Sequence, residues 1–139
     1  MGKVDKVLLT PLKKISNPKG DIFHGLKKSD VGFNGFGEAY FTTIAKNEIK
    51  GWKKHTKMTL NLIVPAGEIE FVLYDETIKE FKSIVSSPEN YQRLTVPPNF
   101  WMAFRGIGNG LNMALNSADI EHDPDEAENC KLEKIPYEW

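Results

Sequence analysis

The chain has 139 residues, of which 40% are hydrophobic and 27% are charged, as in an ordinary globular domain with a buried core. Its 18 basic and 19 acidic residues nearly cancel, so no overall basic field favours nucleic acid as a partner. The longest predominantly apolar runs, 60–64 and 100–104, fall far short of the roughly 20 residues that a membrane-spanning helix needs. We therefore expect one domain that binds neither nucleic acid nor a membrane.

The N-terminus and the cysteine content bear on localisation. The chain begins Met-Gly-Lys-Val-Asp-Lys, without the apolar segment of a secretion signal. Lys6 occupies the position where a myristoylation motif requires Ser or Thr. Cys130 is the single cysteine, so no internal disulfide can form, which fits a reducing compartment. These features predict a cytoplasmic protein.

Short segments rich in β-branched and aromatic residues follow one another along the chain, and turn-forming residues such as those at 16–21 separate them. No segment shows a strong period of 3.6 residues, and the segments recur about every ten residues. This spacing favours an antiparallel sandwich or barrel. The predicted strands cover 4–10, 35–44, 50–64, 68–75, 80–85, 91–96, 100–105 and 111–116.

Two turns and the C-terminal tail complete this prediction. We expect 65–67 to close a hairpin between its two flanking strands. Residues 106–110 resemble a phosphate-binding loop in composition, but no helix follows, so a hairpin turn is predicted there too. The tail, 119–139, has little periodicity. Three apolar residues should anchor it to the barrel: Ile135, Tyr137 and Trp139.

The segment 50–67 contains the densest run of positive charge and one of the three histidines. Read as a continuous strand, it places alternate side chains on opposite faces. The polar face would contain Lys53, His55, Lys57, Thr59 and Asn61, and the apolar face Trp52, Met58, Leu60, Leu62 and Val64. Such a polar face predicts a binding cavity in which a lysine or an imidazole moves a proton. The alternative is a solvated edge strand whose lysines discourage aggregation.

The same alternation suggests further cavity residues on neighbouring strands. Tyr40 or Trp101 would stack on a base or a sugar, Arg105 would pair with a diphosphate, and Asn112 would bind hydroxyl groups. For each of these residues the alternative to a binding role is an ordinary strand position, either exposed to solvent or hydrogen-bonded within the protein. The three histidines have no metal-ligand spacing and no serine lies in a nucleophile motif, so no metal or cofactor is expected.

Two motifs carry a family resemblance. Lys-Gly-Trp-Lys-Lys-His at 50–55, in a segment that ends at Gly67, and Pro-Pro-Asn-Phe-Trp-Met-Ala-Phe at 97–104 resemble the core motifs of the cupin-fold nucleotide-sugar enzymes. These are the dTDP-4-dehydrorhamnose 3,5-epimerases and the dTDP-sugar 3,4-ketoisomerases. Turns at 17–21 and 87–90 are also similar. The resemblance implies an all-β, cupin-type antiparallel β-barrel (jelly roll) over about 4–118, an extended C-terminal tail over 119–139, and a homodimer.

The family motifs also imply site residues. The family's base histidine falls on Lys53, and the second polar position of that motif falls on His55, which is also histidine in the ketoisomerases. The histidine of the second motif falls on Met102. The tyrosine that acts as the general acid in the epimerases falls on His122, two residues before Pro124. Lys53 or His55 is then the expected base, with His122 or Tyr40 returning the proton.

The resulting hypothesis is that the protein epimerises a nucleotide-linked 4-keto sugar, either at C3 alone or at both C3 and C5. The product would be used to build cell-surface polysaccharide or lipopolysaccharide. The alternatives are a 3,4-ketoisomerase, a sugar-nucleotide-binding cupin without catalysis, and a structural subunit that docks an acidic partner. The nucleotide-diphosphate sugar would be held by residues from several strands. These expected substrate-binding residues are Lys50, Lys57, Asn61, Trp101, Arg105 and Asn112.

Overall fold

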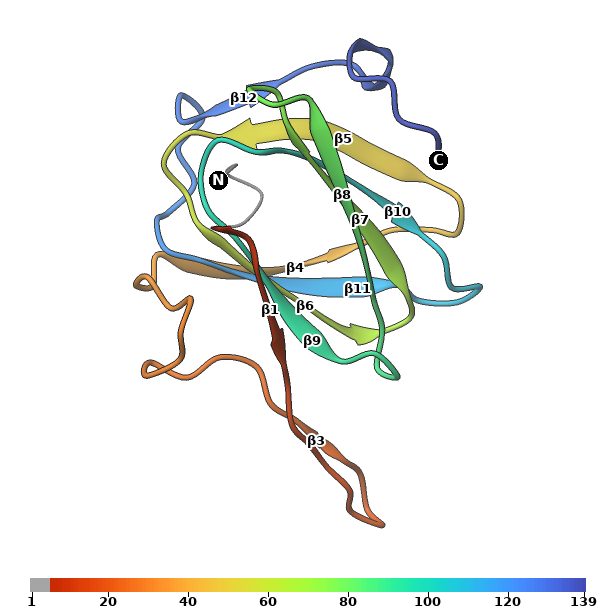
Figure 1. Ribbon diagram of the computed structural model, residues 1–139. Coiled ribbons are helices and arrows are strands. Elements are labelled where there is room, and N and C mark those ends of the chain that lie inside the picture. Colours follow the sequence, from red (N-terminus) through yellow and green to blue (C-terminus); the bar gives the residue numbers. More distant parts are fainter. Residues whose placement is uncertain (1–5) are drawn as a thin grey trace.

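The computed structural model describes residues 6–139, so the first part of the predicted strand 4–10 lies outside the described residues. The described chain is built almost entirely from β-strands (Figure 1). None of its helices is long and apolar enough to cross a membrane. The elements are β1 Leu8–Pro11, β2 Lys14–Ile15, β3 Ile22–Phe23, β4 Glu38–Thr43, β5 Ile49–His55, β6 Leu60–Ala66, β7 Ile69–Asp75, β8 Glu80–Ser86, β9 Gln92–Val96, β10 Trp101–Gly106, β11 Met113–Ala118, β12 Ala127–Asn129 and the 3-10 helix η2 Leu132–Lys134.

Two five-stranded antiparallel sheets face each other. The β6 sheet has the order β1-β9-β6-β11-β4, and the β5 sheet has the order β12-β5-β10-β7-β8. From β4 to β12 the chain passes from one sheet to the other at every connection except that between β7 and β8. This crossing pattern is that of a jelly roll, so the predicted antiparallel barrel is confirmed. The small hairpin of β2 and β3 projects from one end (Figure 1).

The connectivity corrects two local predictions. The segment 50–67 is not one strand, because β5 and β6 lie in different sheets and 56–59 carries the chain between them. The segments 65–67 and 106–110 also cross between sheets and close no hairpin. The buried Asn112 ties these crossings together, since its Oδ1 accepts the Glu68 N–H at 2.9 Å and its Nδ2 donates to the Gly108 carbonyl at 2.9 Å. Strand alternation alone does not reveal which sheet a strand joins.

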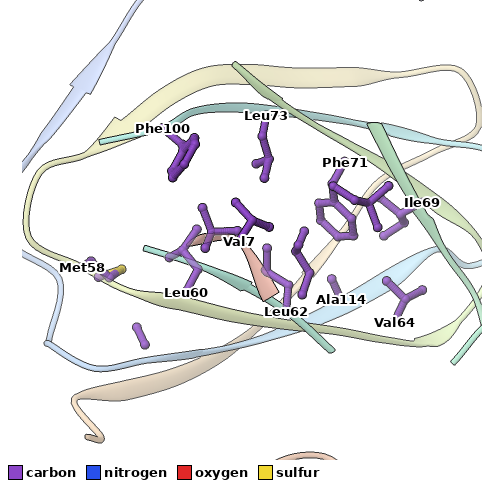
Figure 2. Close-up of a cluster of buried hydrophobic side chains, with 14 of the residues drawn as sticks. Val7, Met58, Leu60, Leu62, Val64, Ile69, Phe71, Leu73, Phe100 and Ala114 are labelled. Carbon is purple, nitrogen blue, oxygen red and sulfur yellow. The ribbon is translucent and has the colours of Figure 1, made fainter. Parts of the chain in front are cut away.

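The inner faces of the two sheets form the hydrophobic core (Figure 2). Each large side chain in it contributes roughly 1.5–3 kcal/mol to folding. Strands β6 and β7 lie inside their sheets, with a neighbouring strand on both sides, and are buried along most of their length. The core side chains labelled in Figure 2 are Val7, Met58, Leu60, Leu62, Val64, Ile69, Phe71, Leu73, Phe100 and Ala114.

The C-terminal tail covers the outer face of the β5 sheet. Ile135 is buried there against Trp52 and Trp101, and Tyr137 and Trp139 pack around them. The Trp52 indole N–H donates to the Leu132 carbonyl at 3.2 Å. The three predicted anchors therefore hold the tail on the barrel, on the face opposite to the core.

The outer face of the β6 sheet contains a buried arginine. The Arg93 side chain is fully buried and donates to Asn61 Oδ1 at 3.2 Å and to the carbonyls of Gly25 at 2.9 Å and Val31 at 3.0 Å. It also forms a 3.2 Å ion pair with Asp30. These contacts fasten the loop that precedes β4 to the sheet. We call these five residues the Arg93 cluster.

Candidate active site

A pocket of about 280 Å³ opens between the two sheets. Strand β4 of one sheet and strand β5 of the other contribute to its walls. Its floor is apolar because it shares Leu60, Leu62 and Phe71 with the core. Its rim is polar and contains two lysines. The lining residues are Tyr40, Thr42, Lys50, Gly51, Trp52, Lys53, His55, Leu60, Leu62, Phe71, Met102, Phe104, Asn116 and Asn129.

A bulge in β5 turns both Lys50 and Lys53 toward the pocket. In a regular strand, residues three apart point to opposite faces. Here the register of β5 against β10 shifts, so that two residues of β5 lie opposite Ala103 alone. Gly51 permits this close approach, because a Cβ at this position would lie 2.3 Å from the Ala103 Cβ. The bulge thus brings three polar side chains of β5, including His55, to one cavity.

His55 is held by a buried carboxylate. Its Nδ1 lies 2.7 Å from Oε1 of Glu126, a residue in the tail just before β12. The other oxygen, Oε2, accepts the backbone N–H groups of Lys57 and Met58, both at 3.0 Å. Burial raises the pKa of Glu126, but the hydrogen bonds from His55 and from these two backbone groups outweigh it and lower the pKa to about 2.

The ionised state of Glu126 fixes the protonation pattern of His55. A carboxylate only accepts hydrogen bonds, so the Nδ1 of His55 carries a hydrogen and donates it. The neutral imidazole then has its lone pair on Nε2, in a side chain that lines the pocket. When Nε2 takes up a proton, the adjacent carboxylate stabilises the positive charge. This arrangement suits a general base.

Tyr40 lies on the opposite wall, on β4. Its hydroxyl oxygen accepts a 3.2 Å hydrogen bond from Nδ2 of the buried Asn116. Asn116 is fixed in turn, because its Oδ1 accepts the Asn61 backbone N–H at 3.2 Å. With its oxygen already accepting, the Tyr40 hydroxyl is available to donate to a ligand.

The two lysines of the pocket differ in their contacts. The Lys50 ammonium donates to the Thr43 carbonyl at 2.7 Å and lies 5.9 Å from the centre of the Phe104 ring. Lys53 is exposed at the rim, and within residues 6–139 its ammonium has no hydrogen-bond or ion-pair partner. A free ammonium group at a pocket rim attracts anionic groups of a ligand.

Several residues expected in the cavity lie elsewhere. Asn61 is on the outer face of the β6 sheet, where its Oδ1 accepts hydrogen bonds from Arg93 at 3.2 Å and Thr95 at 2.6 Å. Lys57 is exposed beyond the end of β5 and does not line the pocket. The reason is the crossing at 56–59, after which Leu60 and Leu62 face the pocket instead. Asn112 ties the strand crossings together and has no free polar group.

Strand β10 presents its other face to the pocket. Trp101 and Arg105 point outward, Trp101 into the cluster beneath the tail and Arg105 to Glu70, which it contacts at 3.1 Å. Met102 and Phe104 line the pocket in their place. His122 is exposed outside the pocket, and its backbone N–H donates to Oε1 of Glu38. The sequence pattern correctly placed Trp101 and Arg105 on the same face of β10, but that face points away from the pocket.

Sequence reasoning missed Glu126 and Asn129. Both belong to the tail, where no periodicity indicates a strand, yet β12 pairs with β5 and brings Asn129 opposite Lys53. No local signal distinguishes Glu126 from the neighbouring carboxylates at 123, 125 and 128. Within the described residues no group of three or more His, Cys, Asp or Glu side chains is placed to hold a metal ion.

Comparison with known proteins extends these observations. The crystal structure of a dTDP sugar isomerase from Desulfovibrio desulfuricans superimposes with a TM-score of 0.93 at 31% sequence identity, over 100% of this chain and 94% of that chain. A sugar 3,4-ketoisomerase from Thermoanaerobacterium thermosaccharolyticum, solved in complex with TDP, has a TM-score of 0.77 at 22% identity, over 93% of this chain and 91% of that chain.

A 3,5-epimerase from Legionella pneumophila, solved with dTDP-4-keto-L-rhamnose, has a TM-score of 0.82 at 15% identity, over 97% of this chain and 79% of that chain. Among curated proteins, a probable low-salt glycan biosynthesis epimerase from Haloferax volcanii is 27% identical over 110 residues. This match spans 72% of this chain and 66% of the relative, just under two thirds of its length. No protein-family model matches the chain.

Proposed function

The chain belongs to the family of cupin-fold enzymes that isomerise or epimerise nucleotide-linked sugars, and from this premise we propose that it epimerises a dTDP-linked 4-keto sugar. The single observation that carries the proposal is the pair of His55 and Glu126 in the pocket wall. An imidazole with a fixed tautomer, beside a carboxylate that stays ionised, is suited to remove a proton from carbon. The resemblance of the two sequence motifs to this family supports the same reaction.

In the proposed reaction His55 takes the proton from the carbon next to the C4 ketone. The C–H electron pair forms a C=C bond, and the carbonyl π pair moves to the oxygen to give an enolate. Lys53 lies at the same pocket and offers positive charge to that oxygen. His55, rather than Lys53, is the proposed base because Glu126 holds it in the form that accepts a proton.

Epimerisation requires that the proton return to the opposite face of the sugar ring. Tyr40 on β4 and His55 on β5 belong to facing walls of the pocket, and Tyr40 has a hydroxyl hydrogen to donate. This placement favours epimerisation, with Tyr40 as the acid. Lys50 is proposed to hold a phosphate group at the rim. The relative from Haloferax volcanii supports a role in the synthesis of a surface glycan.

The second candidate is a 3,4-ketoisomerase, which the 31% identity to a dTDP sugar isomerase favours. In that reaction the proton removed from C3 is delivered to C4 while the C3 hydroxyl proton passes to the C4 oxygen, so the ketone moves to C3 and a base on one face is sufficient. His55 would serve in both reactions, so the two proposals share the base and differ in the need for Tyr40.

We further propose a cytoplasmic homodimer. Large apolar side chains are exposed on β4 and on the projecting hairpin, among them Phe41, Ile22 and Phe23, and their burial against a second copy would stabilise a dimer. Light scattering after gel filtration tests the dimer. A monomer at micromolar concentration would contradict this part of the proposal.

Incubation with a dTDP-4-keto-6-deoxy sugar in D2O, followed by NMR, tests the activity. Deuterium at C3, or at C3 and C5, with an inverted product supports epimerisation. Deuterium transfer accompanied by movement of the ketone to C3 supports ketoisomerisation. Binding of the nucleotide sugar without any exchange would instead identify a non-catalytic binding protein.

A further inference from the structure

The C-terminal tail contributes a side chain to the pocket. Strand β12 adds to the edge of the β5 sheet, with Asn129 opposite Lys53 and Ala127 opposite His55. Backbone hydrogen bonds in both directions between Trp52 and Cys130, at 3.2 and 3.1 Å, fix the strand at this position. The inward-facing row of this strand pair thus contains Lys53, His55 and Asn129.

The hydrogen-bond pattern brings Lys53 and Asn129 together. Trp52 and Cys130 exchange both hydrogen bonds, so the next pair, Lys53 and Asn129, is a non-hydrogen-bonded pair. In antiparallel sheets such pairs have their Cα atoms only about 4.5 Å apart, and their side chains lie close together. An ammonium group and an amide are therefore available to the same atom of a ligand.

Both groups are unpaired in the part of the chain that the structure describes. Within residues 6–139 neither the Lys53 ammonium nor the Asn129 amide forms a hydrogen bond or an ion pair. Three other polar side chains of the lining have protein partners: Lys50 on β5 donates to the Thr43 carbonyl, Asn116 on β11 donates to the Tyr40 hydroxyl, and His55 is paired with Glu126 through Nδ1. Within the described residues, the two β5-sheet side chains of the pocket without a protein partner, Lys53 and Asn129, thus lie beside His55.

We infer that Asn129, a residue of the tail strand, joins Lys53 in binding the ketone oxygen of the substrate and the enolate formed from it. This inference rests on the proposed function. His55 lies two residues from Lys53 on the same face, about 7 Å along the strand. A ketone oxygen held by Lys53 and Asn129 leaves the adjacent C–H group within reach of the His55 imidazole. The hydrogen bond from the amide strengthens as charge moves to the oxygen, so it lowers the barrier.

The test compares Asn129→Ala, Asn129→Asp and a control, Glu128→Gln, in the deuterium exchange assay. Glu128 lies on the same strand, faces away from the pocket and pairs with Lys54 at 3.5 Å. Asn129→Ala should lower kcat about 10- to 100-fold. Asn129→Asp should lower it further, because a carboxylate repels the enolate. Glu128→Gln should leave kcat unchanged, and all three should bind TDP within about twofold of the wild type.

Two results would overturn the inference while leaving the proposed function intact. One is exchange at the wild-type rate in both Asn129 variants, and the other is a loss of TDP affinity that accounts for the whole loss of activity. Partial recovery in Asn129→Ser, which restores a donor, distinguishes loss of the hydrogen bond from disturbance of β12. Absence of exchange in the wild type, with TDP bound, would overturn the proposed function and with it the inference.

Discussion

The Arg93 cluster and the pocket are two polar assemblies on opposite sides of the β6 sheet, and they differ in which of their polar groups remain unpaired. The buried Arg93 guanidinium donates to groups on three sides and is neutralised by Asp30. The backbone N–H of Lys27 and the charge of Arg93 lower the pKa of Asp30 despite its partial burial. In the pocket, Lys53, Asn129 and one nitrogen of His55 have no partner among residues 6–139.

This difference separates a structural cluster from a candidate catalytic one. A buried polar group that has every partner it needs stabilises one packing arrangement. A group that faces a cavity without a partner is available to a ligand. Mutations should therefore divide into those that lower stability and those that lower turnover, and only one residue, Glu126, should do both.

Arg93→Met should have the largest effect on stability. It removes the ion-pair partner of Asp30, the donor to the carbonyls of Gly25 and Val31, and one of the two donors to Asn61 Oδ1, so we expect a loss of about 3–5 kcal/mol in the free energy of unfolding. Chemical denaturation measures this loss. Folded Arg93→Met should retain wild-type exchange activity. A strong loss of activity in the folded variant would show that the Arg93 cluster is not purely structural.

The matched control is Arg105→Met. This substitution removes a partly exposed ion pair with Glu70 on the other sheet. We expect it to cost about 1 kcal/mol or less, because solvent screens the pair. A cost equal to that of Arg93→Met would show that complete burial is not the deciding feature.

Glu126→Gln should lower both stability and turnover. The variant loses the charge that accepts hydrogen bonds from His55 and from two backbone groups, and its amide favours the wrong tautomer of His55. We expect roughly 3 kcal/mol lower stability at neutral pH, from the lowering of the Glu126 pKa from 4.5 to about 2. The exchange rate should fall at least about tenfold.

The pH dependence gives the sign of the Glu126 contribution. Because its pKa is lower in the folded state, the stabilisation is complete above about pH 4.5 and is lost as the pH falls toward 2. Unfolding free energies of the wild type and of Glu126→Gln should thus differ by a constant amount above pH 5 and converge below it. A difference that persists at pH 2 would contradict ionisation as its cause.

Lys57→Gln should have the smallest effect. Lys57 is exposed and lies two residues after His55 in the sequence, but its side chain does not line the pocket. We expect a change of less than about 0.5 kcal/mol in stability and an unchanged exchange rate. A large loss of activity would mean that positive charge near the pocket matters irrespective of its position.

The sequence predicted the class of fold because strand periodicity and turn residues are local signals. Most of the predicted strands are present, and β8 and β9 lie close to their expected bounds. Sheet assignment failed at 65–67 and 106–110, because a crossing and a hairpin use the same turn-forming residues. The face of β10 was also missed, since Met102 and Trp101 fit either side of a buried strand equally well.

Only part of the site was accessible from sequence. His55, Lys50, Lys53 and Tyr40, which the sequence pattern suggested, line the pocket, and their roles are proposals. The bulge at Gly51 depends on contact with Ala103, and the pairing of β12 with β5 depends on how the tail folds back. Both are contacts between segments distant in sequence, so no local pattern predicts Glu126 and Asn129 as partners of β5.

The most direct test of the central claim, that His55 removes a proton from the carbon next to the ketone, is deuterium exchange in His55→Ala beside the wild type. At saturating dTDP-4-keto-6-deoxy sugar we expect the exchange rate of the variant to be about 10²- to 10⁴-fold lower, with unchanged TDP affinity. Lys53→Ala should lose less activity, since it lacks only charge stabilisation. Exchange in His55→Ala at the wild-type rate would contradict the account.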